Sequence, residues 1–137
     1  MARMLVIDDD AAWRALYRMA FEDHFEVVEA GDGQEGLLAL DAFDPDVIVL
    51  DLRMPRMDGL DFIRRLGRRR VRGAIVVCSG AIDDRESPAI PGVRLTSKSP
   101  DLRDLWSALR SAVPELSAEA GATRHIAVPL KDDVWRD

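Results

Sequence analysis

Short runs of apolar residues recur along the chain and are separated by longer, mixed stretches. In chain order they cover Met4–Ile7, Phe25–Val28, Val47–Leu50, Ala74–Cys78 and Val93–Thr96. Glu26 interrupts the second run, and the last run is weaker than the other four. Runs this short and continuous are typical of parallel β-strands that are covered on both faces. The pattern therefore predicts five buried strands.

Most of the stretches between and after these runs carry apolar residues at helical spacing. The spacing predicts helices near residues 13–21, 37–40, 60–66 and 102–113. For the last of these helices, Ser99 is a suitable cap and Pro100 a suitable first residue. Strands and helices that alternate in this order predict an α/β fold, with a doubly wound, five-stranded parallel sheet between two layers of helices.

The stretch between Gly80 and Val93 departs from this pattern. It consists of residues 81–92, and Pro88 and Pro91 within it cannot lie inside a regular helix. We therefore expect a shortened fourth helix here, with at most one turn near Asp83–Ser87.

Composition excludes several classes of function. The chain has a formal net charge of -6, which does not suit general binding to the phosphate backbone of nucleic acids. The single cysteine, Cys78, excludes an internal disulfide and a thiolate zinc site. No apolar run approaches the roughly 20 residues that span a membrane, and nothing resembles a signal peptide. We therefore expect a cytoplasmic protein that binds neither membranes nor nucleic acid.

The length of 137 residues suggests one domain. Pro114 follows the last helical pattern, and the residues after it begin with a small, polar stretch that is typical of a linker. The chain is therefore expected to consist of one domain over residues 1–113 and a C-terminal tail over residues 114–137, which is too short to hold a second domain.

Polar and charged residues stand where four of the predicted strands end. In chain order they are Asp8, Asp9 and Asp10 after the first strand, Asp51 after the third, Ser79 after the fourth and Lys98 after the fifth. The carboxyl ends of parallel strands meet at one edge of a sheet, where such folds bind their ligands. We therefore expect three of these four carboxylates, a hydroxyl and an ammonium group to converge at this edge.

Carboxylates gathered this closely repel one another unless a counter-charge is present. Mg²⁺ relieves this repulsion, because it binds a few carboxylates, keeps water ligands and bridges to phosphoryl oxygens. Beside such an ion Asp51 stays ionised and can attack phosphorus, while Lys98 and the Ser79 hydroxyl meet the charge of the transferred group. The pattern predicts an acyl phosphate on Asp51 as the product.

The stretch PDVIVLDLRMPRMDG, from Pro45 to Gly59, resembles the phosphoacceptor strand and loop of the response-regulator receiver domains. The pair Asp8-Asp9, with Arg14 soon after it, is a second match to this family. Ser79 stands where the family has a serine or threonine, and Lys98 stands where it has a lysine. The resemblance covers about residues 4–113.

The resemblance implies a flavodoxin-like sheet with strand order 2-1-3-4-5. It implies that a sensor histidine kinase or a phosphotransfer protein phosphorylates Asp51, and that the chain, without an output domain, then signals to an unknown downstream protein. The chain would be a phosphoacceptor with autophosphatase activity at most, rather than an enzyme. The resemblance also implies that Asp9 and Asp51 bind Mg²⁺ directly, Asp8 through water and Arg53 through its backbone carbonyl.

The chain departs from the family pattern at several places. Ser99 separates Lys98 from Pro100, Leu95 stands where the family often has an aromatic residue, and the fourth helix is shortened. The last two departures touch a surface that many receivers use for output. They leave open a pseudo-receiver, an interaction module that phosphorylation does not control. A further alternative is a phosphatase of the haloacid dehalogenase type, because Asp8-Asp9-Asp10 mimics the Asp-x-Asp motif of that family.

Some of the remaining polar and aromatic residues have simpler structural interpretations. Asp10 is the aspartate best placed to cap the first helix. Cys78 lies in a buried run and is expected to be inert, and Trp13 lies on an apolar helix stripe and is expected to pack. Six arginines between Arg64 and Arg72 form a basic run, for which a solvated helix end is favoured over a patch that binds a partner.

Overall fold

The structure is a computed structural model, and it describes residues 1–54, 56–66, 74–80 and 93–113. The elements in chain order are β1 (Ala2–Ile7), α1 (Ala11–Phe21), β2 (Phe25–Ala30), α2 (Gly33–Phe43), β3 (Val47–Asp51), α3 (Gly59–Leu66), β4 (Ala74–Ser79), β5 (Val93–Ser97) and α4 (Arg103–Ala112). The five strands are those that the apolar runs predict, and each is one or two residues longer than its run.

The five strands form one parallel sheet in the order β2-β1-β3-β4-β5. This order confirms the predicted doubly wound α/β fold. The register pairs Ile7 with Leu50, Asp51 with Cys78, and Ser79 with Ser97. The strand ends that carry the polar residues therefore lie side by side at one edge of the sheet.

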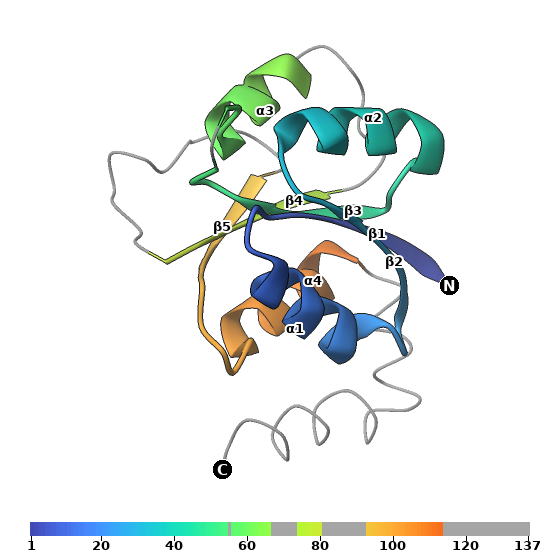
Figure 1. Ribbon diagram of the computed structural model, residues 1–137. Helices are drawn as coiled ribbons and strands as arrows, with labels where there is room; N and C mark the ends of the chain where they lie inside the picture. Colours follow the sequence, from blue (N-terminus) through green and yellow to red (C-terminus); the bar gives the residue numbers. More distant parts are fainter. Residues whose placement is uncertain (55, 67–73, 81–92, 114–137) are drawn as a thin grey trace.

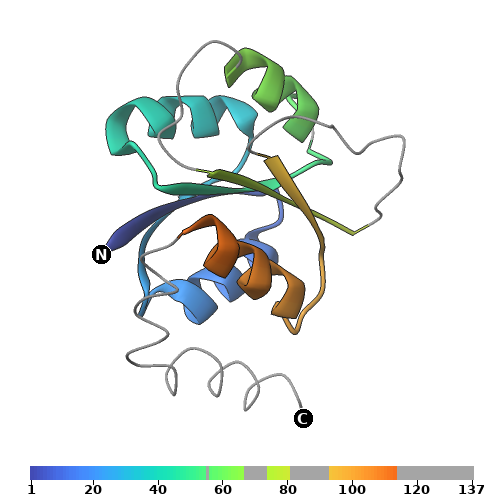
Figure 2. The same ribbon diagram turned by 180° about the vertical axis from the view of Figure 1, so that it is seen from behind.

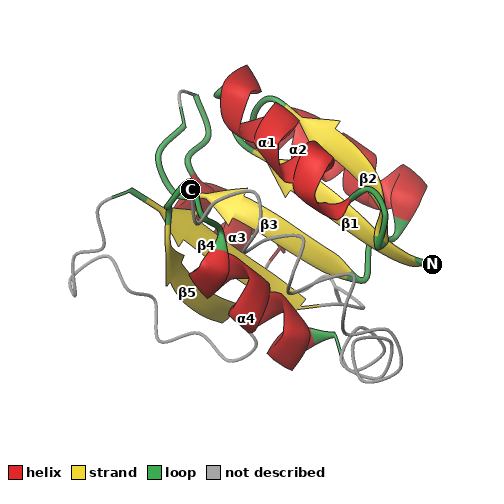
Figure 3. Ribbon diagram, turned by 90° about the horizontal axis from the view of Figure 1, so that it is seen from below, coloured by secondary structure: helices red, strands yellow, loops and turns green. Residues whose placement is uncertain are grey.

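The central strands send alternate side chains into two separate cores, which is why they are apolar at nearly every position. On β1, Met4 and Val6 belong to one core, and Leu5 and Ile7 belong to the other. The first core contains residues of α1 and α4, and the second contains residues of α3 and is flanked by α2. Figures 1 and 2 show these helices in two layers on opposite faces of the sheet, and Figure 3 shows the strands side by side.

Helix α2 is longer than its short apolar pattern predicts, because glycines occupy part of its buried face. Gly33 and Gly36 are both buried, and a Cβ at Gly36 would lie only 2.5 Å from Cδ1 of Ile7. The helix therefore packs closely on β1 without large side chains at these positions. Asp32 marks its start, since its side chain accepts a hydrogen bond from the N–H of Glu35 at 2.8 Å.

Helix α4 begins later than the sequence predicts. Ser99 and Pro100 belong to a turn, in which the N–H of Leu102 donates to the Ser99 carbonyl at 3.0 Å. The helix begins at Arg103, and Leu102 before it has a left-handed backbone with a φ of 56°. The prediction that Ser99 caps a helix starting at Pro100 is therefore wrong. The turn places the Leu102 side chain in the core, and this burial outweighs the local cap signal.

Parts of the sequence prediction fall outside the described residues. These are the shortened fourth helix between Gly80 and Val93, the tail over residues 114–137 and the basic run beyond Leu66. Within the described part, Arg64 is exposed and pairs with Asp61 at 3.0 Å, as expected for a solvated helix end. None of the described helices is both long enough and apolar enough to cross a membrane.

Candidate functional site

Three aspartates meet at the carboxyl edge of the sheet. Asp8 directly follows β1, Asp9 comes next, and Asp51 is the last residue of β3. One carboxylate oxygen of each lies within 4.8 Å of those of the other two. Asp8 and Asp51 are buried, whereas Asp9 is exposed. The structure therefore brings together carboxylates that the strand ends predict to converge.

The ammonium group of Lys98 lies against this cluster. Its Nζ is 2.8 Å from Oδ2 of Asp8 and 3.5 Å from Oδ2 of Asp51, and none of the three side chains is more than 10% exposed. Burial alone would lower the pKa of Lys98, but the hydrogen bond to Asp8 and the negative charges of Asp8 and Asp51 outweigh it and raise the pKa. Lys98 is therefore a permanent positive charge between two carboxylates.

The carboxyl group of Asp51 is difficult to ionise. Burial, with the charge of Asp8 as the next cause, raises its pKa from 3.8 to about 6. The Lys98 ammonium and the N–H of Arg53, which lies 3.4 Å from Oδ1 of Asp51, lower this pKa but do not cancel the effect. The single ammonium therefore does not balance the negative charge of the cluster, and a further cation would favour ionised Asp51.

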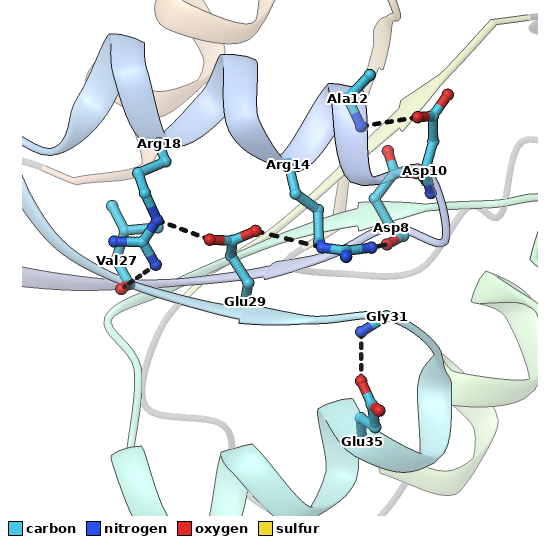
Figure 4. A network of polar contacts seen from close by, with 9 residues as sticks. All are labelled: Asp8, Asp10, Ala12, Arg14, Arg18, Val27, Glu29, Gly31 and Glu35. Atoms are coloured by element: carbon cyan, nitrogen blue, oxygen red, sulfur yellow. Dashed lines mark hydrogen bonds and ion pairs between the residues drawn. The ribbon is translucent and has the colours of Figure 1, made fainter.

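Arg14 of α1 ties the turn that carries Asp8 to Glu29 of β2, and Arg18 pairs with the same glutamate (Figure 4). Arg14 donates from Nη1 to the Asp8 carbonyl at 2.7 Å, and its Nε lies 3.2 Å from Oε1 of Glu29. Arg18 contacts the other oxygen of Glu29 at 2.6 Å and also donates to the Val27 carbonyl at 3.1 Å. Glu29 therefore orients both arginines, and of the two it is Arg14 that holds the backbone of the acidic turn.

The loop after β3 folds back onto the strand at Gly59. The N–H of Gly59 donates to the Leu52 carbonyl at 2.9 Å, and a Cβ at this position would lie 2.6 Å from the carbonyl oxygen of Asp51. Glycine permits this close approach because it has no side chain. Asp58 caps the start of α3 by accepting from the N–H of Asp61 at 2.8 Å. The Asp58-Gly59 pair therefore fixes the loop beside Asp51.

Ser79, the last residue of β4, is buried at the same edge. Its carbonyl accepts a hydrogen bond from the N–H of Lys98 at 2.8 Å, and its neighbour Cys78 is in register with Asp51. Cys78 is buried, as predicted, and accepts a hydrogen bond from the Tyr17 hydroxyl at 3.4 Å. Burial raises the pKa of the Cys78 thiol, which keeps it protonated and weakly nucleophilic.

Asp10 is used differently from the two aspartates before it. Its side chain accepts a hydrogen bond from the N–H of Ala12 at 2.9 Å and caps α1, which confirms the predicted cap. Its own N–H donates to Oδ1 of Asp8 at 2.9 Å. A phosphatase of the haloacid dehalogenase type would need Asp10 as an acid in the site, so this capping bond argues against that alternative.

One contact of Lys98 is not evident from the sequence. Its Nζ lies 4.8 Å from the centroid of the Trp13 ring. Trp13 packs half-buried against the core beneath α1, as its apolar stripe predicts. The contact with Lys98 depends on the rotation of α1 about its axis and on two side-chain rotamers, and an apolar stripe specifies neither closely enough.

Comparison with known proteins agrees with this geometry. Residues 4–95 match the family model described as the response regulator receiver domain. The chain belongs to this family. Among similar proteins is the protein-glutamate methylesterase/protein-glutamine glutaminase 3 of Rhodospirillum rubrum, which is 41% identical over 81 residues that make up 58% of this chain and 22% of that protein. The receiver thus spans well under half the length of the curated relatives it matches.

Solved structures share the receiver fold. The chemotaxis protein CheY4 of Vibrio cholerae has a TM-score of 0.73 at 25% identity, covering 82% of this chain and 99% of that one. The response regulator TrrA of Thermotoga maritima, in complex with Mg²⁺ and BeF, has a TM-score of 0.74 at 23% identity, covering 82% of this chain and 100% of that one. TrrA is also seen in complex with the histidine kinase ThkA.

Proposed function

We propose that this receiver accepts a phosphoryl group on Asp51 from a sensor histidine kinase or a phosphotransfer protein, and then signals through contacts with another protein. The observation that carries the proposal is the buried cluster of Asp8 and Asp51 with the Lys98 ammonium between them. The complex of TrrA with the kinase ThkA supports a partner of this kind. We assign the receiver domain to residues 1–113 and treat residues 114–137 as a tail.

The donor set at the sheet edge suits Mg²⁺. Hard oxygen ligands from three carboxylates lie within reach of one another, and their charge is incompletely balanced by Lys98. Mg²⁺ binds few carboxylates and keeps water ligands that a phosphoryl oxygen can replace. We propose Asp9 and Asp51 as direct ligands, Asp8 as a ligand through water and the backbone carbonyl of Arg53 as a further ligand. When bound, Mg²⁺ supplies positive charge to the transferred phosphoryl oxygens.

The transfer itself needs Asp51 as an ionised nucleophile. One of its carboxylate oxygens forms a bond to phosphorus, the bond from phosphorus to the nitrogen or oxygen of the donor breaks, and the donor atom keeps the electron pair. Lys98, 3.5 Å from Oδ2 of Asp51, is placed to neutralise the charge on one phosphoryl oxygen. We assign the Ser79 hydroxyl, at the neighbouring strand end, to a second one.

Acetyl phosphate provides a direct test that needs no knowledge of the kinase. The chain is incubated with this donor in Mg²⁺ and, separately, in excess EDTA, and the intact mass is measured. We expect a mass gain of one phosphoryl group in Mg²⁺ and none in EDTA. A chain that gains no mass in Mg²⁺ would instead be a pseudo-receiver. The departures from the family pattern at Leu95 and in the sequence of residues 81–92 are the reason for considering this alternative.

The affinity for Mg²⁺ should depend on pH through Asp51. Because the pKa of Asp51 is raised to about 6, a proton competes with the cation below that pH and is absent well above it. We expect the apparent Kd for Mg²⁺ to be about tenfold lower at pH 7 than at pH 5. Titration calorimetry at constant ionic strength measures this change. A Kd that is the same at both pH values would contradict the part given to Asp51.

Arg14 should affect Mg²⁺ binding through the backbone of the acidic turn. The change Arg14→Lys keeps the positive charge but loses the forked guanidinium that spans the Asp8 carbonyl and Glu29. We expect Mg²⁺ to bind about tenfold more weakly, at the lower end of the effect of losing a group that orients a metal ligand. Arg18→Lys is the matched control, because Arg18 pairs with the same Glu29 and bonds the Val27 carbonyl instead. If the two changes weaken Mg²⁺ binding equally, the bond from Arg14 to the Asp8 carbonyl does not contribute to Mg²⁺ binding.

A further inference from the structure

The ammonium group of Lys98 has an aromatic neighbour as well as its two carboxylate partners. Nζ lies 4.8 Å from the centroid of the Trp13 ring, within the range of a cation–π interaction, and tryptophan is the aromatic residue that attracts a cation most strongly. The Lys98 side chain is 10% exposed, so the interaction is partly desolvated and stronger than at an open surface.

Packing against the core holds the Trp13 ring in this position. Its centroid lies 5.8 Å from that of Tyr17, one turn further along α1. Tyr17 is buried, and its hydroxyl donates to Sγ of Cys78 at 3.4 Å, so its ring is fixed by packing and by this hydrogen bond. Cys78 is in register with Asp51. The side chains of Cys78, Tyr17 and Trp13 therefore form a series of contacts that begins beside Asp51 and ends at Lys98.

The carboxylate partners of Lys98 are shared with the proposed cation site. Nζ is closer to Asp8, at 2.8 Å, than to Asp51, at 3.5 Å. A divalent cation that binds these carboxylates weakens their attraction for the ammonium group of Lys98. The cation also repels this ammonium group, because both are positively charged. The face of the Trp13 ring attracts the ammonium group without being a ligand of the cation.

We propose that Trp13 is a positioning residue, which holds the Lys98 ammonium beside Asp51 when a divalent cation binds the carboxylates of Asp8 and Asp51. This inference rests on the function proposed above. Loss of the aromatic face should leave Lys98 charged but loosely placed. Phosphoryl transfer to Asp51 should then slow at saturating Mg²⁺, because an ammonium group that is not held in place stabilises the transferring oxygens less well.

The test compares Trp13→Leu, which keeps an apolar side chain without a π face, with Trp13→Phe, which keeps a π face. The first readout is the Lys98 ε-methylene signal in the metal-free, unphosphorylated protein. Lys98 and Lys131 are the two lysines of the chain, so ¹³C-lysine labelling gives two resolvable ε signals, assigned with Lys98→Arg. The second readout is the rate of phosphorylation by acetyl phosphate at saturating Mg²⁺. Trp106→Phe is the control, because Trp106 is a second tryptophan of the same core that stacks on Phe21.

We expect the Lys98 signal to be shifted upfield by the indole ring in the wild type and in Trp106→Phe, partly shifted in Trp13→Phe and unshifted in Trp13→Leu. We expect Trp13→Leu to be phosphorylated about fivefold more slowly and Trp13→Phe within about twofold of the wild type. An unshifted Lys98 signal in the wild type overturns the proposal, whether or not the chain is phosphorylated. An equal rate in Trp13→Leu and the wild type also overturns it. A wild type that shows the shift but takes up no phosphate refutes the proposed function, and with it the positioning role.

Discussion

The variant Asp51→Asn is expected to gain no phosphoryl group from acetyl phosphate in Mg²⁺, under conditions in which the wild type is modified. The amide of asparagine is not a nucleophile toward phosphorus, so the rate should fall by more than about a hundredfold. Intact mass spectrometry over time measures the loss. Asp51 is buried, and the change conserves its shape, so the site around it should remain in place.

The matched control is Asp58→Asn, in the same loop. Asp58 caps α3 through the N–H of Asp61, and asparagine is an equally good cap. This variant should be phosphorylated at nearly the wild-type rate. A mass gain that persists in Asp51→Asn, or one that is lost equally in Asp58→Asn, would exclude Asp51 as the acceptor.

Unfolding cannot explain a loss of phosphorylation in Asp51→Asn, because this variant should be at least as stable as the wild type without metal. The folded-state pKa of about 6 lies above the ordinary value of 3.8. The folded state therefore binds the proton more tightly, and stability falls as pH rises from about 4 to about 6. At pH 7 the full cost of an ionised Asp51 is present, and asparagine removes about 1 to 3 kcal/mol of it. Denaturant unfolding in EDTA measures this difference.

The strands were predictable because burial on both faces leaves few choices of residue. The ends of the strands were harder to predict. Arg3 in β1 and Glu29 in β2 belong to the β1–β2 ladder but lie outside the predicted runs, because both side chains are exposed and a ladder residue with an exposed side chain need not be apolar. Helix α2 was underestimated for a related reason, since Gly36 packs against Ile7 by having no side chain. The pattern Asp32-x-x-Glu35, a signal for a helix start, would have located its first turn.

The candidate site was predictable to the extent that it follows from topology. Parallel strands in this order necessarily bring Asp8, Asp51 and the end of β5 to one edge, whatever their side chains do. The neighbours that orient these groups do not follow from topology. Arg14 reaches the Asp8 carbonyl, and Trp13 reaches Lys98, only because α1 has a particular rotation on the sheet, and the apolar stripe defines that rotation too coarsely.

Single substitutions among the three consecutive aspartates can distinguish a metal ligand from a helix cap. Asp8 is a poor choice for the test, because it also bonds Lys98 and the N–H of Asp10. Asp9 is exposed and has a carboxylate oxygen in the cluster. We therefore expect Asp9→Asn to weaken Mg²⁺ binding about thirtyfold, or about 2 kcal/mol, because a charged ligand is replaced by a neutral one.

Asp10→Asn removes the same charge one residue further along the chain and serves as the control. Its side chain caps α1 through the N–H of Ala12, and asparagine keeps this bond. Mg²⁺ affinity in Asp10→Asn should stay within about threefold of the wild type, since what changes is a solvent-screened charge outside the cluster. Calorimetric titration at physiological ionic strength distinguishes the two variants. If both lose affinity equally, the cation responds to the overall charge of the turn, and Asp9 is not a ligand.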